Sequence, residues 1–365
     1  MLRKLLIATA ATLFFLNLTA QDSTKTLAIS GNVDAYYRYN FAGQSGSVRN
    51  FNNFTSFTNS QSSFELGMAS LRADATALSG KVGATVDLGF GRRAEEFSYN
   101  DGEQESKNGF ISLSMVKQAY ITYAPSSKVK FTAGKFATHV GYELLDAPLN
   151  RNYSMSYMFT NGPFFHTGLK MDVTAGPVGF MVGVANYTDQ STSTTGVKGL
   201  IAQFSGAVPS GNFKWYLNYA GFFGSKGGNN PSTLESLNQV DLVLLGTVSS
   251  KFNIGYNGTL QSKKPPTGSL NPKGAWIGNA VYLNFDPTDK VGLTLRSEFI
   301  SDDNKKVLLG TNVFANTLSL DLKMGPLTII PELRYESAKS EFFADGDGDP
   351  TKSTFSALVA AVFKF

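Results

Sequence analysis

The last thirteen residues of the chain, Ser353–Phe365, read S-T-F-S-A-L-V-A-A-V-F-K-F and decide the fold. Every second position of this stretch is apolar: Phe355, Ala357, Val359, Ala361, Phe363 and Phe365. Successive side chains of a β-strand point to opposite faces, so strict alternation predicts a strand with one face in an apolar medium and the other in a different one.

The same alternation begins near the start of the chain and recurs along it. Residues 27–41 alternate for about fifteen positions, which is longer than the ~5–6 residues of a typical soluble strand and enough to cross a bilayer at a tilt. The phase of the pattern is ambiguous between Phe64 and Arg72 and again at Lys117. Strands are predicted near 27–41, 64–77, 82–90, 111–123, 129–140, 167–174, 178–187, 197–208, 213–223, 240–248, 252–261, 275–285, 291–300, 313–324, 327–336 and 353–365.

The connections between these strands alternate in length. Short turns such as 78–81 and 325–326 are followed by long stretches such as 141–165 and 301–312. This asymmetry is typical of transmembrane antiparallel β-barrels, with short periplasmic turns and longer extracellular loops. The pattern predicts about sixteen strands, with fourteen or eighteen as alternatives that differ by one hairpin. The chain shows none of the self-similar blades of a propeller.

Composition agrees with this fold class and excludes several functions. Of the 365 residues, 42% are hydrophobic, yet mean hydropathy is −0.10, as expected when lipid-facing and lumen-facing residues alternate. A net charge of +4 is too small to predict binding to nucleic acid. The absence of Cys excludes disulfides and thiolate metal sites. With two His, His139 and His166, a histidine-based metal or catalytic cluster is not expected, and neither is a cofactor.

Residues 1–20 have the organisation of an export signal peptide. Arg3 and Lys4 precede the apolar stretch 5–18, and a cleavage site is expected before Gln21. The alternative, a transmembrane anchor, is disfavoured because the apolar stretch is short. We therefore expect an exported protein in which residues 21–365 form a single barrel domain.

The strand faces opposite the apolar ones carry many charges. A barrel of about eight strands packs its interior with side chains, whereas an interior with this many charges has to contain water. The sequence therefore predicts a barrel with a water-filled lumen, which is a channel. The charged residues on these faces are Asp34, Arg38, Lys170, Asp172, Lys214, Asp241, Arg296, Glu298, Asp321, Lys323, Glu332 and Arg334.

The long connection 141–165 is unusually aromatic and apolar for a solvated loop. We expect it to fold into the lumen and narrow the pore, its acids facing basic wall residues such as Arg38, Arg296 or Arg334. Opposed charges would select solutes by charge and size. The alternatives are a cap on neighbouring loops and a subunit contact. The candidate pore-lining and constriction residues are Asp34, Arg38, Glu143, Asp146, Arg151, Arg296, Glu298, Glu332 and Arg334.

Three acidic residues near the end, Asp345, Asp347 and Asp349, are spaced like the start of a calcium-binding loop. The match then fails, because Pro350 stands where an EF-hand has Gly and Ser356 where it has a bidentate Glu. We interpret the stretch as an acidic turn, with a weak surface Ca²⁺ site as the alternative.

The sequence contains no complete enzyme signature. Residues 89–94, G-F-G-R-R-A, resemble a dinucleotide-binding fingerprint, but the polar stretch 92–108 predicts a loop where that motif needs a helix. No G-x-S-x-G nucleophile motif occurs. The sequence does not predict an enzyme.

Four stretches resemble the OmpL-like β-barrel porin family: Val116–Tyr123, Ala133–Phe136, Leu145–Ser154 and Ile330–Tyr335. The resemblance covers essentially the whole mature chain. The terminal Phe365 is similar to the last residue of Gram-negative outer-membrane barrels. These likenesses imply an outer-membrane location, contact with lipid, and recognition of the closing strand by the barrel-assembly machinery.

The resemblance further implies a porin for passive diffusion of small hydrophilic solutes, with a homotrimer as one expected assembly. The alternative function is a non-conducting outer-membrane barrel with a surface-binding or structural role.

Overall fold

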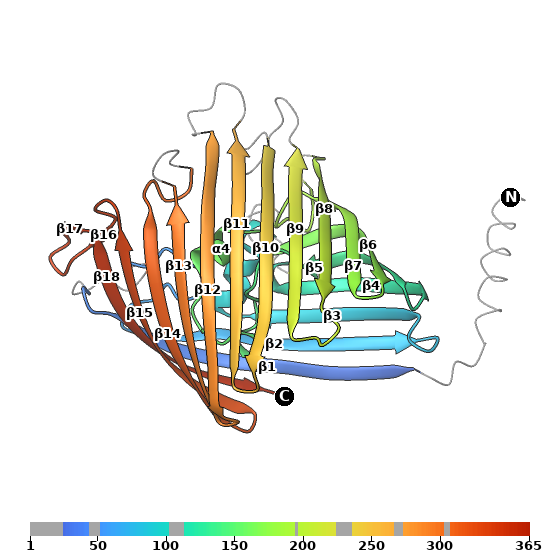
Figure 1. Ribbon diagram of the computed structural model, residues 1–365, viewed down its shortest axis with the longest axis horizontal. Helices are drawn as coiled ribbons and strands as arrows, with labels where there is room; N and C mark the ends of the chain where they lie inside the picture. Colours follow the sequence, from blue (N-terminus) through green and yellow to red (C-terminus); the bar gives the residue numbers. More distant parts are fainter. Residues whose placement is uncertain are drawn as a thin grey trace, which may run out of the picture.

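The computed structural model describes residues 25–43, 52–101, 113–193, 196–223, 236–265, 273–302 and 307–365. The predicted signal peptide, residues 1–20, lies outside the described residues. Within them the chain forms a closed antiparallel barrel of 16 strands, shown in Figure 1, which confirms the predicted fold class and strand number. None of the described helices has the length and apolar character to cross a membrane.

The barrel strands are β1 (Thr26–Asn40), β2 (Ser63–Ala77), β3 (Val82–Phe90), β4 (Val116–Ser126), β5 (Val129–Ala137), β6 (Phe165–Ala175), β7 (Val178–Asn186), β8 (Lys198–Ala207), β9 (Phe213–Phe223), β10 (Ser236–Ser249), β11 (Phe252–Lys264), β12 (Gly274–Thr288), β13 (Val291–Ser301), β14 (Val313–Met324), β15 (Leu327–Ala338) and β18 (Ser353–Lys364). The connections contain α2 (Arg92–Phe97), η1 (Leu113–Met115), η2 (Ala147–Leu149), α4 (Tyr157–Asn161) and the two-stranded sheet of β16 (Phe343–Ala344) and β17 (Pro350–Thr351).

The two ends of the chain close the barrel. Strand β18 pairs with β15 on one side and with β1 on the other. At the seam, the Gly31 N–H donates to the Phe365 carbonyl at 3.0 Å, and the Phe365 N–H donates to the Gly31 carbonyl at 3.0 Å. Because every barrel strand then has two neighbours, the sheet has no open edge to leave unpaired in lipid.

Short and long connections lie at opposite ends of the barrel. Thr26 at the start of β1 pairs with Thr76 beside the short β2–β3 turn, and Phe363 near the end of β18 pairs with Leu327 beside the short β14–β15 turn. Strand β1 therefore begins, and β18 ends, at the short-turn end. Figure 1 shows the short turns that link β10 to β11 and β12 to β13 together at one end. At Gly325, in the β14–β15 turn, φ is 63°, a conformation that glycine adopts without steric cost.

Each strand separates an apolar outer face from a mostly polar inner one. On β13, Leu295 and Phe299 point outward and are 36% and 42% exposed, whereas Arg296 and Glu298 point inward and are buried. The outer residues form the lipid-facing band of a membrane barrel.

Two β-bulges explain where the sequence pattern was ambiguous. The β1–β2 register shifts between Asp34 and Ala35, which leaves Gly67 without a cross-strand partner. The β3–β4 register shifts between Asp87 and Leu88, which leaves Lys117 unpaired in the ladder. An extra residue in one strand reverses the inside–outside alternation beyond it.

One expectation about local structure was wrong. Residues 92–97 form helix α2, although the polar stretch from Arg92 was predicted to be a loop. The helix forms because Arg93, Ala94 and Phe97 are buried on one face of it, against other parts of the interior, so tertiary packing overrides a weak helical pattern.

Candidate functional site

Residues 138–164, which connect β5 to β6, run through the interior of the barrel, and we call them the crossing loop. The Tyr153 hydroxyl donates to Asp34 of β1 at 2.5 Å. The backbone N–H of Tyr157 donates to Glu298 of β13 at 2.9 Å. Strand β13 is eight strands from β5 in the barrel order, halfway around the wall. The crossing loop therefore spans the lumen from one wall to the opposite one.

A buried ion pair holds the loop to that opposite wall. The Glu143 carboxylate lies 2.5 Å from the Arg296 guanidinium, and both side chains are almost fully excluded from solvent. Arg296 also donates to the carbonyls of Ser154 and Met155, at 2.7 and 3.2 Å. The second Glu143 oxygen accepts the Ser156 N–H at 2.8 Å. These contacts fix residues 143 and 154–156 together.

The other two charged candidates of the loop are also paired. Asp146 lies 2.5 Å from Lys117, a cation that also contacts Asp87 at 3.0 Å. Arg151 makes a two-pronged contact with Asp286 of β12, at 2.7 and 2.9 Å. No carboxylate of the crossing loop is therefore left without a cationic partner in the described structure.

The remaining arginines proposed to face the loop acids have other partners. Arg334 contacts Glu336 at 3.0 Å and Glu298 at 3.3 Å, and it donates to the Met155 carbonyl at 2.9 Å. Arg38 donates to the carbonyls of Ser60 and Asn52, in the β1–β2 connection. The expected facing of loop acids toward Arg38 and Arg334 is thus not observed.

The other two wall candidates, Asp34 and Glu332, contact the backbone or tyrosine groups of the loop. Glu332 accepts the Tyr153 N–H at 2.9 Å and the Ser319 hydroxyl at 2.7 Å.

A buried arginine that the sequence did not indicate joins α2 to the loop. Arg93 donates to the carbonyls of Leu145 and Tyr153, at 3.0 and 3.1 Å. Its guanidinium also lies 5.0 Å from the ring centroid of Phe57 and 4.9 Å from that of Tyr153, in range for cation–π attraction. No periodic pattern marks this residue, because it belongs to the short helix that the sequence did not predict.

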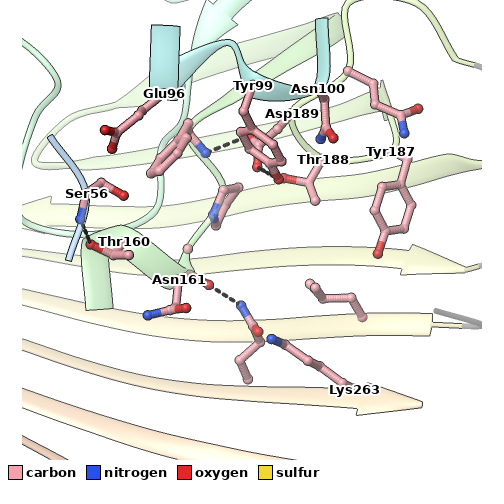
Figure 2. Close-up of a pocket in the computed structure, with 16 residues that line it drawn as sticks. Ser56, Glu96, Tyr99, Asn100, Thr160, Asn161, Tyr187, Thr188, Asp189 and Lys263 are labelled. Carbon is pink, nitrogen blue, oxygen red and sulfur yellow. Dashed lines mark hydrogen bonds between the residues drawn. The ribbon is translucent and has the colours of Figure 1, made fainter. Parts of the chain in front are cut away.

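Two cavities border the crossing loop on the β8–β11 side, and a third, of about 220 Å³, lies between residues 147–151 and the short-turn ends of β14, β15 and β18. The outer cavity, of about 600 Å³, lies on the long-loop side between residues 160–164, residues 187–190 and the ends of β10 and β11 (Figure 2). The inner cavity, of about 430 Å³, lies toward the short-turn end between residues 138–151 and the inner wall formed by β8, β9 and β10.

An apolar cluster packs between the two cavities. Tyr187 and Leu237 of this cluster line the outer cavity, and Val140 lines the inner one. The rings of His139 and His166 lie 5.3 Å apart beside it. Burial lowers the pKa of His139 to about 4, so this ring is neutral at neutral pH.

Two lysines of this wall lie beside the cavities, and one of them, Lys263, is attracted by the carboxylate of Asp302. Lys263 lines the outer cavity, and Lys214 lies opposite Leu245, which lines the inner cavity. Neither lysine makes an ion pair with a described acid. The same wall also carries Asp241 of β10, which makes no ion pair with a described cation and accepts hydrogen bonds from Asn218, Asn257 and the Gly141 N–H.

The acidic stretch near the end of the chain forms a turn. One carboxylate oxygen of Asp345 accepts the N–H groups of Asp347 and Asp349, at 3.0 and 2.9 Å. Within the described parts of the chain, no three His, Asp or Glu side chains gather as they would to hold a metal ion.

A closed barrel with an apolar exterior and a charged interior crossed by a loop defines the class of outer-membrane channel proteins. Residues 26–365 match the family described as "Putative beta-barrel porin-2, OmpL-like". The chain belongs to this family and is an outer-membrane porin.

Solved structures of outer-membrane channels share the fold. The outer membrane channel DcaP of Acinetobacter baumannii is 14% identical, with a TM-score of 0.63 over 94% of this chain and 98% of that one. The anion-selective porin from Comamonas acidovorans is 12% identical, with a TM-score of 0.61 over 94% and 100%. OmpT of Vibrio cholerae, in its trimer form, is 12% identical, with a TM-score of 0.57 over 94% and 100%. No curated protein matches the sequence.

Proposed function

We propose that small hydrophilic solutes diffuse passively along the β8–β11 wall, between this wall and the crossing loop. The observation that carries the proposal is the placement of the two cavities, which lie on opposite sides of the loop against the same part of the wall. Elsewhere the loop is fastened by the Glu143–Arg296 and Arg151–Asp286 ion pairs. The narrowest point of the pathway is the apolar cluster around Val140 and Leu237.

This cluster is the part of the pathway that has to move. Near it the loop is held by single hydrogen bonds, from the Gly141 N–H to Asp241 at 3.0 Å and between His139 and the Tyr219 carbonyl at 3.0 Å. Single hydrogen bonds contribute about 1 kcal/mol each, so residues 139–141 should move away from the wall more easily than the segment held by ion pairs. Side-chain motion at Val140 and Leu237 would join the two cavities.

The pathway favours anions. The crossing-loop acids are neutralised by Lys117 and Arg296. The other acids along the pathway, Asp241, Glu96 and Asp189, accept hydrogen bonds from protein groups, whereas Lys214 and Lys263 make no ion pair with a described acid. Unpaired charges that line a pore raise the local concentration of ions of opposite sign. The anion-selective porin of similar fold supports this preference without establishing it.

Single-channel recording in a planar bilayer tests the proposal. The refolded protein should give stable ohmic steps, and its reversal potential in a KCl gradient should indicate preference for chloride. K214Q and K263Q together should reduce that preference, whereas K81Q, in the exposed β2–β3 turn, should leave it unchanged. Unchanged selectivity in the double variant would contradict the proposed route.

The second candidate function is a non-conducting barrel with a surface-binding or structural role. The buried cluster between the two cavities favours it, because packed apolar side chains exclude water. A correctly folded barrel that gives no conductance steps would support this function instead.

We also propose that the protein assembles as a homotrimer and is inserted through recognition of its closing strand. Support for the trimer comes from OmpT of Vibrio cholerae, which has a trimer form and the same fold. Native mass spectrometry of the detergent-extracted protein should then give a mass of three chains, and a monomer mass would contradict the trimer.

A further inference from the structure

The outer cavity has the features of a ligand site. Its lining comes from α2 and the residues after it, the end of α4, the β7–β8 connection and the long-loop ends of β10 and β11. Figure 2 shows Tyr99, Asn100 and Asp189 on one side and Asn161 and Lys263 on the other. At about 600 Å³ it falls in the size range of small-molecule pockets.

The two acids that line the cavity accept hydrogen bonds from groups of the protein. Glu96 accepts the Phe57 N–H and the Asn59 amide, both at 2.7 Å. Asp189 accepts the N–H groups of Phe164 and Phe165, at 2.6 and 3.0 Å. These carboxylates therefore shape the cavity, and each uses two or three of its roughly four acceptor sites on protein groups.

Two other polar groups lack partners, and they have opposite hydrogen-bonding character. The side chain of Gln190 is 1% exposed, and its Oε1 atom accepts no hydrogen bond from any described residue. Lys263 donates to no described residue, and its ammonium can only donate. A buried acceptor without a donor is unfavourable, and a ligand that donates to Gln190 would remove this cost.

One kind of ligand group satisfies both. A hydroxyl donates one hydrogen bond and accepts two, so a ligand with several hydroxyls can donate to Gln190 and accept from Lys263. A carboxylate can only accept, so it would pair with Lys263 but leave Gln190 unsatisfied and lie near Glu96 and Asp189. The lining therefore favours a neutral polyhydroxylated ligand over an acidic one.

The remaining lining suits the same ligand. The rings of Tyr99, Phe164 and Tyr187 border the cavity, together with the amides of Asn100 and Asn161. Aromatic rings provide flat apolar surface for the C–H faces of a sugar ring, and amides both donate and accept hydrogen bonds.

We propose that the outer cavity binds a neutral mono- or disaccharide before it enters the pathway. This inference rests on the proposed function insofar as bound sugar is a transported solute, but binding itself can be measured without conductance.

The fluorescence of Trp276 can report ligand binding in the outer cavity. Its Nε1–H donates to Gln261 at 3.1 Å, and Gln261 lines the cavity. The other tryptophan is Trp215, on a different strand, so W215F isolates the signal. We would titrate refolded W215F with glucose, maltose and the acidic sugar gluconate, and follow tryptophan fluorescence.

The expected result is a saturable change with glucose or maltose, with half-saturation in the millimolar range, of order −4 kcal/mol, and weaker binding of gluconate. Q190L and K263M should each weaken sugar binding by about tenfold or more. K81M, in the β2–β3 turn, should bind as the parent does. Heat-modifiable mobility on gels would verify that each variant is folded.

Failure of this inference can be distinguished from failure of the proposed function. A folded channel that conducts but shows no saturable change up to about 100 mM sugar would overturn the saccharide site and leave the porin function standing. Tighter binding of gluconate than of glucose would also overturn it, in favour of an anion site. Saturable sugar binding without conductance would support the site and contradict the diffusion pathway.

Discussion

Glu143 and Arg296 are 153 residues apart in the sequence, yet their side chains meet at 2.5 Å inside the barrel. Removing two charges from water is costly, and the cost is offset when the remaining hydrogen-bonding capacity of both groups is used. Arg296 largely meets this condition, because its two terminal nitrogens donate to Ser154, Met155 and the Thr317 hydroxyl, while its Nε lies 3.8 Å from the Glu298 carboxylate. The pair thereby holds the aromatic crossing loop in a fixed position across the lumen.

Breaking this pair from one side should destabilise the barrel and loosen the crossing loop. E143Q leaves the buried Arg296 guanidinium with only the more distant Glu298 carboxylate, at 3.8 Å, as counter-charge, with an expected cost of about 3–5 kcal/mol, and R296M should cost as much. Urea unfolding in lipid vesicles would measure both. The double variant E143Q/R296M should be less destabilised than the sum of the two single variants, because no lone charge remains.

The same variant also changes the charge of the lumen. E143Q adds one net positive charge, so reversal potentials should shift toward anions. E341Q, an exposed residue of the β15–β18 connection, is the matched control and should alter neither stability nor selectivity. If the destabilisation of E143Q/R296M equals the sum of the destabilisations of the two single variants, Glu143 and Arg296 do not act as a pair.

Arg93 should be as important for the position of the loop as Arg296. R93M removes the donors to the Leu145 and Tyr153 carbonyls and should destabilise the barrel by about 2–4 kcal/mol. R93K keeps the charge but loses the planar, two-pronged geometry and the stacking on Phe57 and Tyr153, so it should recover less than half of that loss. Urea unfolding separates these outcomes, and full rescue by R93K would show that charge alone matters. R92K, on the adjacent half-exposed residue, is the control.

The fold was predictable because its main determinant is local. The alternation in residues 353–365 or 291–300 is readable within a single strand, and the length of each connection is readable between strands. These features predict a barrel of about sixteen strands with its long connections together at one end. The pattern allows fourteen to eighteen strands, and its phase was ambiguous at the bulges beside Gly67 and Lys117, since a bulge is set by contacts between strands.

The interior was less predictable for the same physical reason. Charged residues on the inner faces could be recognised one at a time, but their pairing depends on which strands lie opposite one another in the closed barrel. Lys117, the partner of Asp146, could not be assigned to the inner face because it lies at a bulge. Arg93 could not be identified because it lies in the short helix α2, which the sequence pattern did not predict. Asp189, which caps residues 164 and 165, belongs to a connection with no distinguishing pattern.

Gly31 should be required for closure of the barrel. A Cβ atom at this position would lie 2.6 Å from the Phe365 ring and closer still to the Ser70 carbonyl. G31V should therefore reduce the folded fraction and cost at least about 1–3 kcal/mol through overpacking at the seam. Heat-modifiable mobility would measure the folded fraction of G31V, and urea unfolding would measure its loss of stability.

The control is G246A in β10, where an added Cβ would be 3.9 Å from its neighbour. Equal folding of G31V and G246A would show that the seam tolerates a side chain.

Asp189 should make the stability of the barrel depend on pH. Burial raises the pKa of Asp189 to about 7, from an ordinary value of 3.8. The folded protein therefore keeps the proton at pH values where the unfolded chain has lost it. The resulting contribution to stability is fully present below about pH 4 and is lost as the pH rises through about 7, with an upper limit of about 4 kcal/mol.

D189N cannot ionise, so its unfolding free energy should fall less than that of the parent between pH 4 and 8. D347N, in the exposed acidic turn, should retain the pH dependence of the parent. If D189N and the parent lose stability equally over this range, Asp189 is ionised in the folded barrel and its backbone donors outweigh its burial.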